Sequence, residues 1–164
     1  MPEKMILRAD ILAPDYVKIL TFSGQNISSV LKIIPSLMKD VFKLESSAFY
    51  EDEMKWDTTG DPINFFGAWR GREKKDQRTT LFYIVKIQGS ESKKDKNGTV
   101  EVRITGSILT EFPYENPFQK VLTFSYVRFS YKEQRMKYIV YGRKKLEEFE
   151  RELRRHYEII GAEA

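Results

Sequence analysis

The sequence predicts an α+β protein in which an antiparallel β-sheet of about six strands wraps a long C-terminal helix, with a kinked helix after an N-terminal hairpin. Two observations predict it. Apolar residues alternate along several short segments that are separated by turn-forming residues, and apolar residues at three- and four-residue steps dominate the C-terminal third. A chain of 164 residues with 41 % hydrophobic residues can bury a core of its own. We therefore expect one domain over residues 1–164.

The N-terminal part of the chain predicts two strands and a helix. Residues 5–11 alternate between apolar and polar, residues 13–15 form a turn, and residues 16–23 form a second strand, which together predict a hairpin. Apolar residues then recur at helical spacing from Ile27 to Val41. Pro35 lies inside this helix and is expected to kink or split it.

Four strands follow in the middle of the chain. Their alternating apolar faces lie within residues 48–57, 63–69, 79–88 and 100–108, with the linker 111–115 after the last one. In the first of these strands, the alternation places Asp52 on the same face as Tyr50, Met54 and Trp56.

The C-terminal helix has a clear beginning. Asn116 is a good N-cap, Pro117 suits the first helical position, and Gln119 can reach back as in a capping box. A stripe of apolar residues predicts the buried face, and Gly161 is a stop signal. The stripe consists of Met136, Ile139, Leu146, Phe149, Leu153, Tyr157 and Ile160.

Residues 121–131 allow two interpretations. Their β-branched and aromatic residues favour a strand, whereas the strong cap before them favours a continuous, kinked helix. Apolar residues lie on every side of this segment in either case, so it is either buried or an interface.

Composition excludes several classes of function. Cysteine is absent and His156 is the single histidine, so no nucleophile–base pair and no cysteine metal site can be proposed. The acidic residues within 51–61 lack the spacing of a calcium loop, and neither a metal nor a cofactor is expected. No reaction is indicated, which favours a non-catalytic protein. The chain has no apolar run of 18 residues and no signal-peptide pattern at its N-terminus, and we expect a cytoplasmic protein without a transmembrane segment.

The order of these elements resembles the helix-grip superfamily of START-like and Bet v 1-like proteins. The resemblance covers most of the chain and rests on the order of elements, without a shared motif. It implies a cavity between the sheet and the C-terminal helix that holds a hydrophobic small molecule or a lipid.

The candidate ligand-binding residues follow from the predicted strand faces. Asp52 is expected to point inward, as a polar group in an apolar cavity. Four aromatic side chains could line that cavity: Trp56, Phe65, Trp69 and Tyr83. The alternatives are a structural hydrogen bond or a bulge that turns Asp52 outward, and aromatic residues that are plain core.

Three hypotheses for function follow. The first is a binding module for a hydrophobic small molecule or lipid. The second is an interaction or assembly protein, such as a homodimer, that uses the aromatic segment 118–131. The third is nucleic-acid binding through basic turns and the C-terminal helix; the formal net charge is only +4, and lysine-rich turns are usually just solvated, so nucleic acid is not the expected partner.

Overall fold

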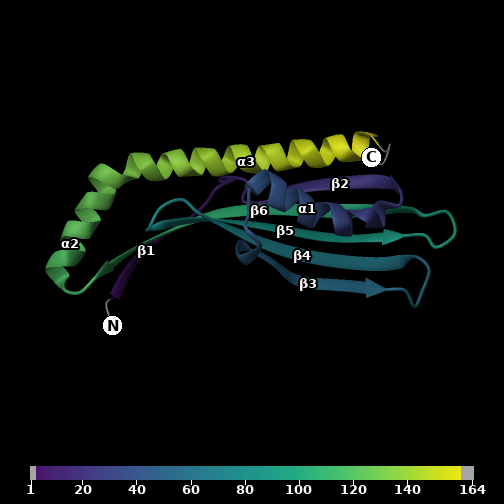
Figure 1. Ribbon diagram of the computed structural model, residues 1–164, viewed down its shortest axis with the longest axis horizontal. Coiled ribbons are helices and arrows are strands. Elements are labelled where there is room, and N and C mark those ends of the chain that lie inside the picture. Colours follow the sequence, from purple (N-terminus) through teal and green to yellow (C-terminus); the bar gives the residue numbers. More distant parts are fainter. Residues whose placement is uncertain (1–2, 160–164) are drawn as a thin grey trace.

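The computed structural model describes residues 3–159 and confirms the α+β fold class (Figure 1). Six strands precede the C-terminal helical region, and one shorter helix lies between the second and third strands. The elements are β1 (Glu3–Asp10), β2 (Lys18–Gln25), α1 (Val30–Phe42), β3 (Phe49–Asp57), β4 (Ile63–Lys74), β5 (Thr79–Glu91), β6 (Asn97–Tyr114), α2 (Pro117–Tyr126), the π-helical turn η3 (Val127–Tyr131) and α3 (Lys132–Ile159).

The sheet is antiparallel throughout, with the order β1–β6–β5–β4–β3. Strand β2 also pairs with β6, so β1 and β2 lie end to end along the same side of that strand. The predicted N-terminal hairpin is corrected in this respect, because its two strands pair with β6 and not with each other. The physical reason is the length of β6: its 18 residues offer β1 and β2 one half each.

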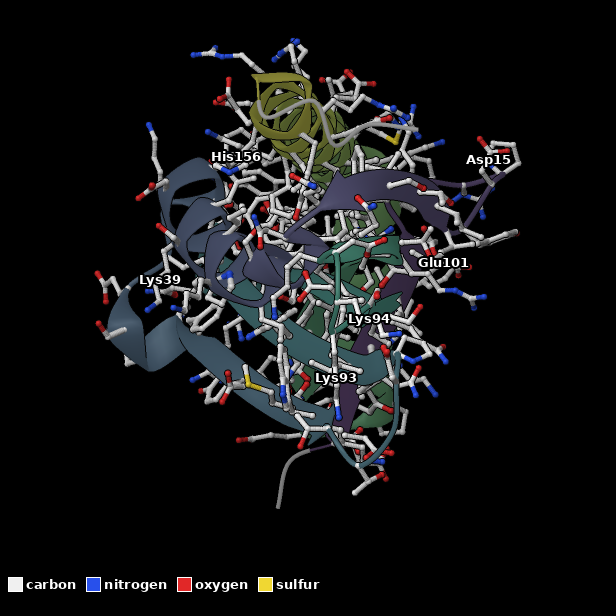
Figure 2. The ribbon with its side chains drawn as sticks, turned by 90° about the vertical axis from the view of Figure 1, so that its right-hand side faces the viewer. Asp15, Lys39, Lys93, Lys94, Glu101 and His156 are labelled. Carbon is white, nitrogen blue, oxygen red and sulfur yellow. The ribbon has the colours of Figure 1, made fainter. Side chains whose placement is uncertain are left out.

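Both α1 and α3 cover the same face of the sheet (Figures 1 and 2). The apolar alternation of β4, β5 and β6 faces these helices, and Leu146, Phe149 and Leu153 of α3 are fully buried against it. Stacked rings fill the space between the layers, with Phe22 and Tyr157 4.6 Å apart and Phe42 and Tyr83 4.0 Å apart between centroids. The core therefore occupies the region where the helix-grip resemblance implies a cavity.

Two glycines allow α3 to lie close to the sheet. A Cβ atom at Gly106 would stand 2.7 Å from a methyl carbon of Leu146, and one at Gly142 would stand 2.9 Å from a methyl carbon of Ile11. Arg143, the residue after Gly142, donates from its guanidinium to the backbone oxygen of Ile11. The guanidinium of Arg143 therefore has a hydrogen-bond acceptor at the border of the core.

Helix α1 runs unbroken past Pro35, which therefore does not split it. The turn before α1 is held by a buried carboxylate from the sheet. Glu91 at the end of β5 accepts hydrogen bonds from the backbone N–H of Ser28 (3.2 Å) and from its hydroxyl (3.1 Å). These bonds fix the start of the helical layer on the sheet.

Candidate functional site

The most unusual region is the aromatic arm (residues 117–140), which comprises α2, η3 and the start of α3. The structure decides between the two interpretations of residues 121–131 in favour of a helix. Asn116 caps it by accepting from the backbone N–H of Gln119 at 2.8 Å, and the Gln119 side chain accepts from the backbone N–H of Glu115 at 2.8 Å. Local capping therefore overrides the β propensity of the segment.

The arm changes direction at η3. Helix α3 lies along the sheet, whereas α2 turns away from that line at one end of the molecule (Figure 1). Sharp bends in helices commonly occur at π-helical turns, because the extra residue interrupts the regular hydrogen-bond ladder. The predicted kink is thus confirmed, at a defined place.

A polar cluster around Asp76 holds this bend against the sheet. Asp76 lies in the β4–β5 turn, and its Oδ2 accepts from the hydroxyls of Tyr131 (2.6 Å) and Tyr138 (3.0 Å). Its Oδ1 accepts from the backbone N–H groups of Arg78 (2.7 Å) and Thr79 (2.8 Å). One carboxylate therefore orders its own turn and binds two turns of the helical region.

Electrostatics agrees with this role for Asp76. Burial on its own would raise the pKa of Asp76, but the hydrogen bonds from Tyr131, Arg78, Tyr138 and Thr79 outweigh it and lower the pKa below its ordinary value. The carboxylate is therefore charged at neutral pH, which strengthens the bonds that it accepts.

The arm presents apolar side chains to solvent and polar-tipped ones to the body. Tyr131 is buried and Arg135 and Tyr138 are half-buried, whereas Phe118 is 72 % exposed and Phe129 is 79 % exposed. Exposure continues along the arm at six further residues: Val121, Leu122, Phe124, Tyr126, Met136 and Val140. This is the reverse of the usual arrangement in a surface helix.

The exposed apolar residues also surround α2. Leu122 and Phe124 are two positions apart and so point to opposite sides of the helix, yet each is about half exposed. Because a large side chain carries roughly 150–250 Å² of surface, eight such residues expose on the order of 800 Å². This total exceeds the largest contiguous apolar patch of a typical monomer, roughly 300–600 Å², but it is divided between opposite sides of the helix.

Met136 is therefore a correction to the predicted buried stripe. The stripe is buried from Leu146 to Tyr157, but Met136 faces solvent because Tyr131, Arg135 and Tyr138, on either side of it in sequence, occupy the inward positions. Their spacing of four and three residues was the sequence signal that could have revealed this. Ile160 and Gly161 lie outside the described residues.

The structure contradicts the inward orientation predicted for Asp52. A β-bulge between Glu51 and Glu53 shifts the pairing of β3 with β4, which breaks the simple alternation. Asp52 is exposed and forms an ion pair with Arg70 at 3.3 Å. The inward orientation was wrong, and the alternative of a bulge that turns Asp52 outward is what the structure shows. The alternating pattern alone could not decide between them, because it contains no sign of the extra residue that a bulge inserts.

The four predicted aromatic residues are not brought together as one pocket lining. Phe65, Trp69 and Tyr83 are buried in the core, whereas Trp56 is 47 % exposed on the edge strand β3. Trp56 stacks on Phe65 with ring centroids 5.9 Å apart. These two residues border a shallow surface hollow of about 480 Å³.

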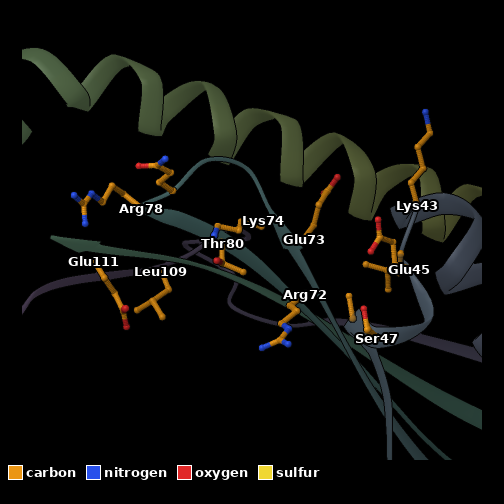
Figure 3. Close-up of a pocket in the computed structure, with 13 residues that line it drawn as sticks. Lys43, Glu45, Ser47, Arg72, Glu73, Lys74, Arg78, Thr80, Leu109 and Glu111 are labelled. Carbon is orange, nitrogen blue, oxygen red and sulfur yellow. The ribbon is translucent and has the colours of Figure 1, made fainter. Parts of the chain in front are cut away.

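A larger hollow, of about 750 Å³, lies beside residues 72–74 at the end of β4, which extend past the pairing with β3 (Figure 3). Charged side chains of both signs dominate its lining, with Arg72 and Lys74 on β4 and Glu111 on β6 among them. It is therefore a poor site for an apolar ligand. Within residues 3–159, no three acidic or histidine side chains are grouped so that they could hold a metal ion, and no helix is both long and apolar enough to span a membrane.

Comparison with models of known protein families and with curated proteins finds no match to this chain. The helix-grip relationship and the binding of a hydrophobic ligand therefore stay predictions.

Proposed function

We propose that this is a non-catalytic protein that assembles with further copies of itself, and that the aromatic arm is the interface. The observation that supports it is the exposure of eight large apolar side chains on one continuous helical region. A standard protein–protein interface takes about 800 Å² from each partner, which is the order of the exposed apolar area of the arm. Water contact with such a surface is unfavourable, and association removes it.

The attachment of the arm is consistent with an interface. A helix with fluctuating position would lose much conformational entropy on binding, which lowers affinity. In the single chain, the Asp76 cluster and the ring contacts of Phe112 with Tyr126 and Tyr131 already attach residues 126–138 of the arm to the sheet. The exposed residues are therefore presented on an ordered helix.

Sedimentation velocity over a range of concentrations tests the proposal. The wild-type chain should form oligomers as concentration rises, whereas the double variant Phe118→Ser/Phe129→Ser should stay monomeric with an unchanged melting temperature. A matched control is Tyr16→Ser/Ile19→Ser, which removes two exposed apolar side chains outside the arm. This control should associate like the wild type.

Two outcomes would overturn the proposal. One is a wild-type chain that remains monomeric up to its solubility limit. The other is an arm that binds vesicles of phosphatidylcholine and phosphatidylserine while the protein shows no self-association, because the arm would then be a membrane-surface helix.

A further inference from the structure

The aromatic arm is positively charged, which restricts the kind of surface that it can bind. Residues 117–140 contain five basic residues and one acidic residue. Arg128, Lys132 and Lys137 form no ion pair within the part of the chain that the structure describes. Two arms packed against each other would place like charges together, which is unfavourable. The surface that accepts the arm should therefore be acidic as well as apolar.

The molecule carries one surface of that kind at its other end. The acidic tip (residues 51–61) consists of most of β3 and the turn into β4, and it contains five acidic residues and one basic residue. Asp52 and Glu53 pair with Arg70 and Lys55. The other three acidic residues form no ion pair within residues 3–159: Glu51, Asp57 and Asp61.

The tip also has apolar surface. Met54 is 46 % exposed and Trp56 is 47 % exposed, and the hollow beside Trp56 is bordered by Phe65 and Phe66. The β5–β6 turn, where Figure 2 labels Lys93, holds the tip. The backbone N–H of Lys93 donates to Asp61, and its ammonium donates to the carbonyl of Thr58. That ammonium contacts the backbone of the turn and also attracts the carboxylate of Asp57.

The arm and the tip of one chain cannot meet. Helix α2 lies at one end of the long axis and the β3–β4 turn lies at the opposite end (Figure 1). Engagement must therefore occur between copies. An interface made by two different surfaces of the same chain repeats from copy to copy and produces a ring or an open filament.

Resting on the proposed function, we infer that the copies associate head to tail, with the basic aromatic arm of one copy docked on the acidic tip of the next. The arm supplies Phe118, Leu122 and Phe129 to the apolar surface around Met54 and Trp56. The positive charge of the arm is then attracted by the net negative charge of the tip, which favours this pairing over arm against arm.

A mixing experiment tests the arrangement. The arm variant is Phe118→Ser/Phe129→Ser and the tip variant is Met54→Ser/Trp56→Ser; all four side chains are substantially exposed, so both variants should fold. Each variant alone should be monomeric in sedimentation velocity. An equimolar mixture should form dimers and nothing larger, because only one intact arm and one intact tip can meet.

A charge exchange supplies a second measurement with less effect on the apolar surface. Arg128→Glu/Lys132→Glu in the tip variant should weaken its binding to the arm variant by at least about tenfold, and Glu51→Lys/Asp57→Lys in the arm variant should restore part of that loss. Wild-type assembly should also weaken as salt concentration rises.

The outcomes separate this inference from the proposed function. If the tip variant assembles like the wild type while the arm variant is monomeric, the arm is an interface but the head-to-tail arrangement is refuted. A mixture that forms no dimer from two folded monomeric variants refutes it as well. If both variants assemble like the wild type, the proposed function fails together with this inference.

Discussion

Replacing Asp76 by alanine should loosen the connection between the sheet and the bend of the C-terminal helix. The substitution removes a charged acceptor for two tyrosine hydroxyls and two backbone N–H groups. Hydrogen bonds to a charged group contribute about 1.5–3 kcal/mol each, but Asp76 is only half-buried, so solvent screens part of this. We expect a loss of about 2–4 kcal/mol in the free energy of unfolding at pH 7.

Urea denaturation of wild type, Asp76→Ala and Asp95→Ala measures this effect. Asp95 is a matched control, since it also lies in a strand-connecting turn and accepts from a backbone N–H two residues later, yet it contacts no helix. The loss in the free energy of unfolding should be clearly smaller for Asp95→Ala than for Asp76→Ala. Hydrogen exchange should also speed up at residues 127–138 in Asp76→Ala and stay unchanged in Asp95→Ala.

The pH dependence provides an independent check. The pKa of Asp76 is lower in the folded chain than its ordinary value of 3.8, so the charged carboxylate stabilises the fold fully above about pH 4. This contribution is lost as pH falls through the lowered pKa. The difference in stability between wild type and Asp76→Ala should therefore shrink below pH 4. Equal losses for the two alanine variants at pH 7 would refute the role given to Asp76.

Three further predictions concern the sheet and its helix. Leu153→Ala should cost roughly 2–5 kcal/mol in urea denaturation, because its side chain is fully buried between α3 and the sheet; a loss under about half a kcal/mol would mean that α3 does not pack as described. Gly98→Ala should also destabilise the chain, by about 1–3 kcal/mol, because its Cβ would stand 2.1 Å from the backbone oxygen of Ser90; an unchanged melting temperature would contradict this contact. Asp52→Asn should change stability by less than about 1 kcal/mol, since its ion pair with Arg70 is exposed, and a larger loss in the same assay would show that Asp52 has a role that the structure does not reveal.

The sequence by itself determined the class of fold and the nature of most elements. The alternation in β4, β5 and β6 and the spacing of Leu146, Phe149 and Leu153 are repeated patterns, and repeated burial on one face leaves a repeated pattern in the chain. The cap at Asn116 was also readable, because a cap is formed by neighbouring residues.

Tertiary structure alone decided the features that bear on function. One inserted residue at the bulge in β3 turned Asp52 to solvent, and alternation cannot register such a shift. The pairing of both N-terminal strands with β6 depended on contacts about a hundred residues apart in sequence. The exposure of the apolar arm depends on where the sheet ends and on the hydrogen bonds of Asp76 to the arm. Both are long-range features that the local sequence does not contain.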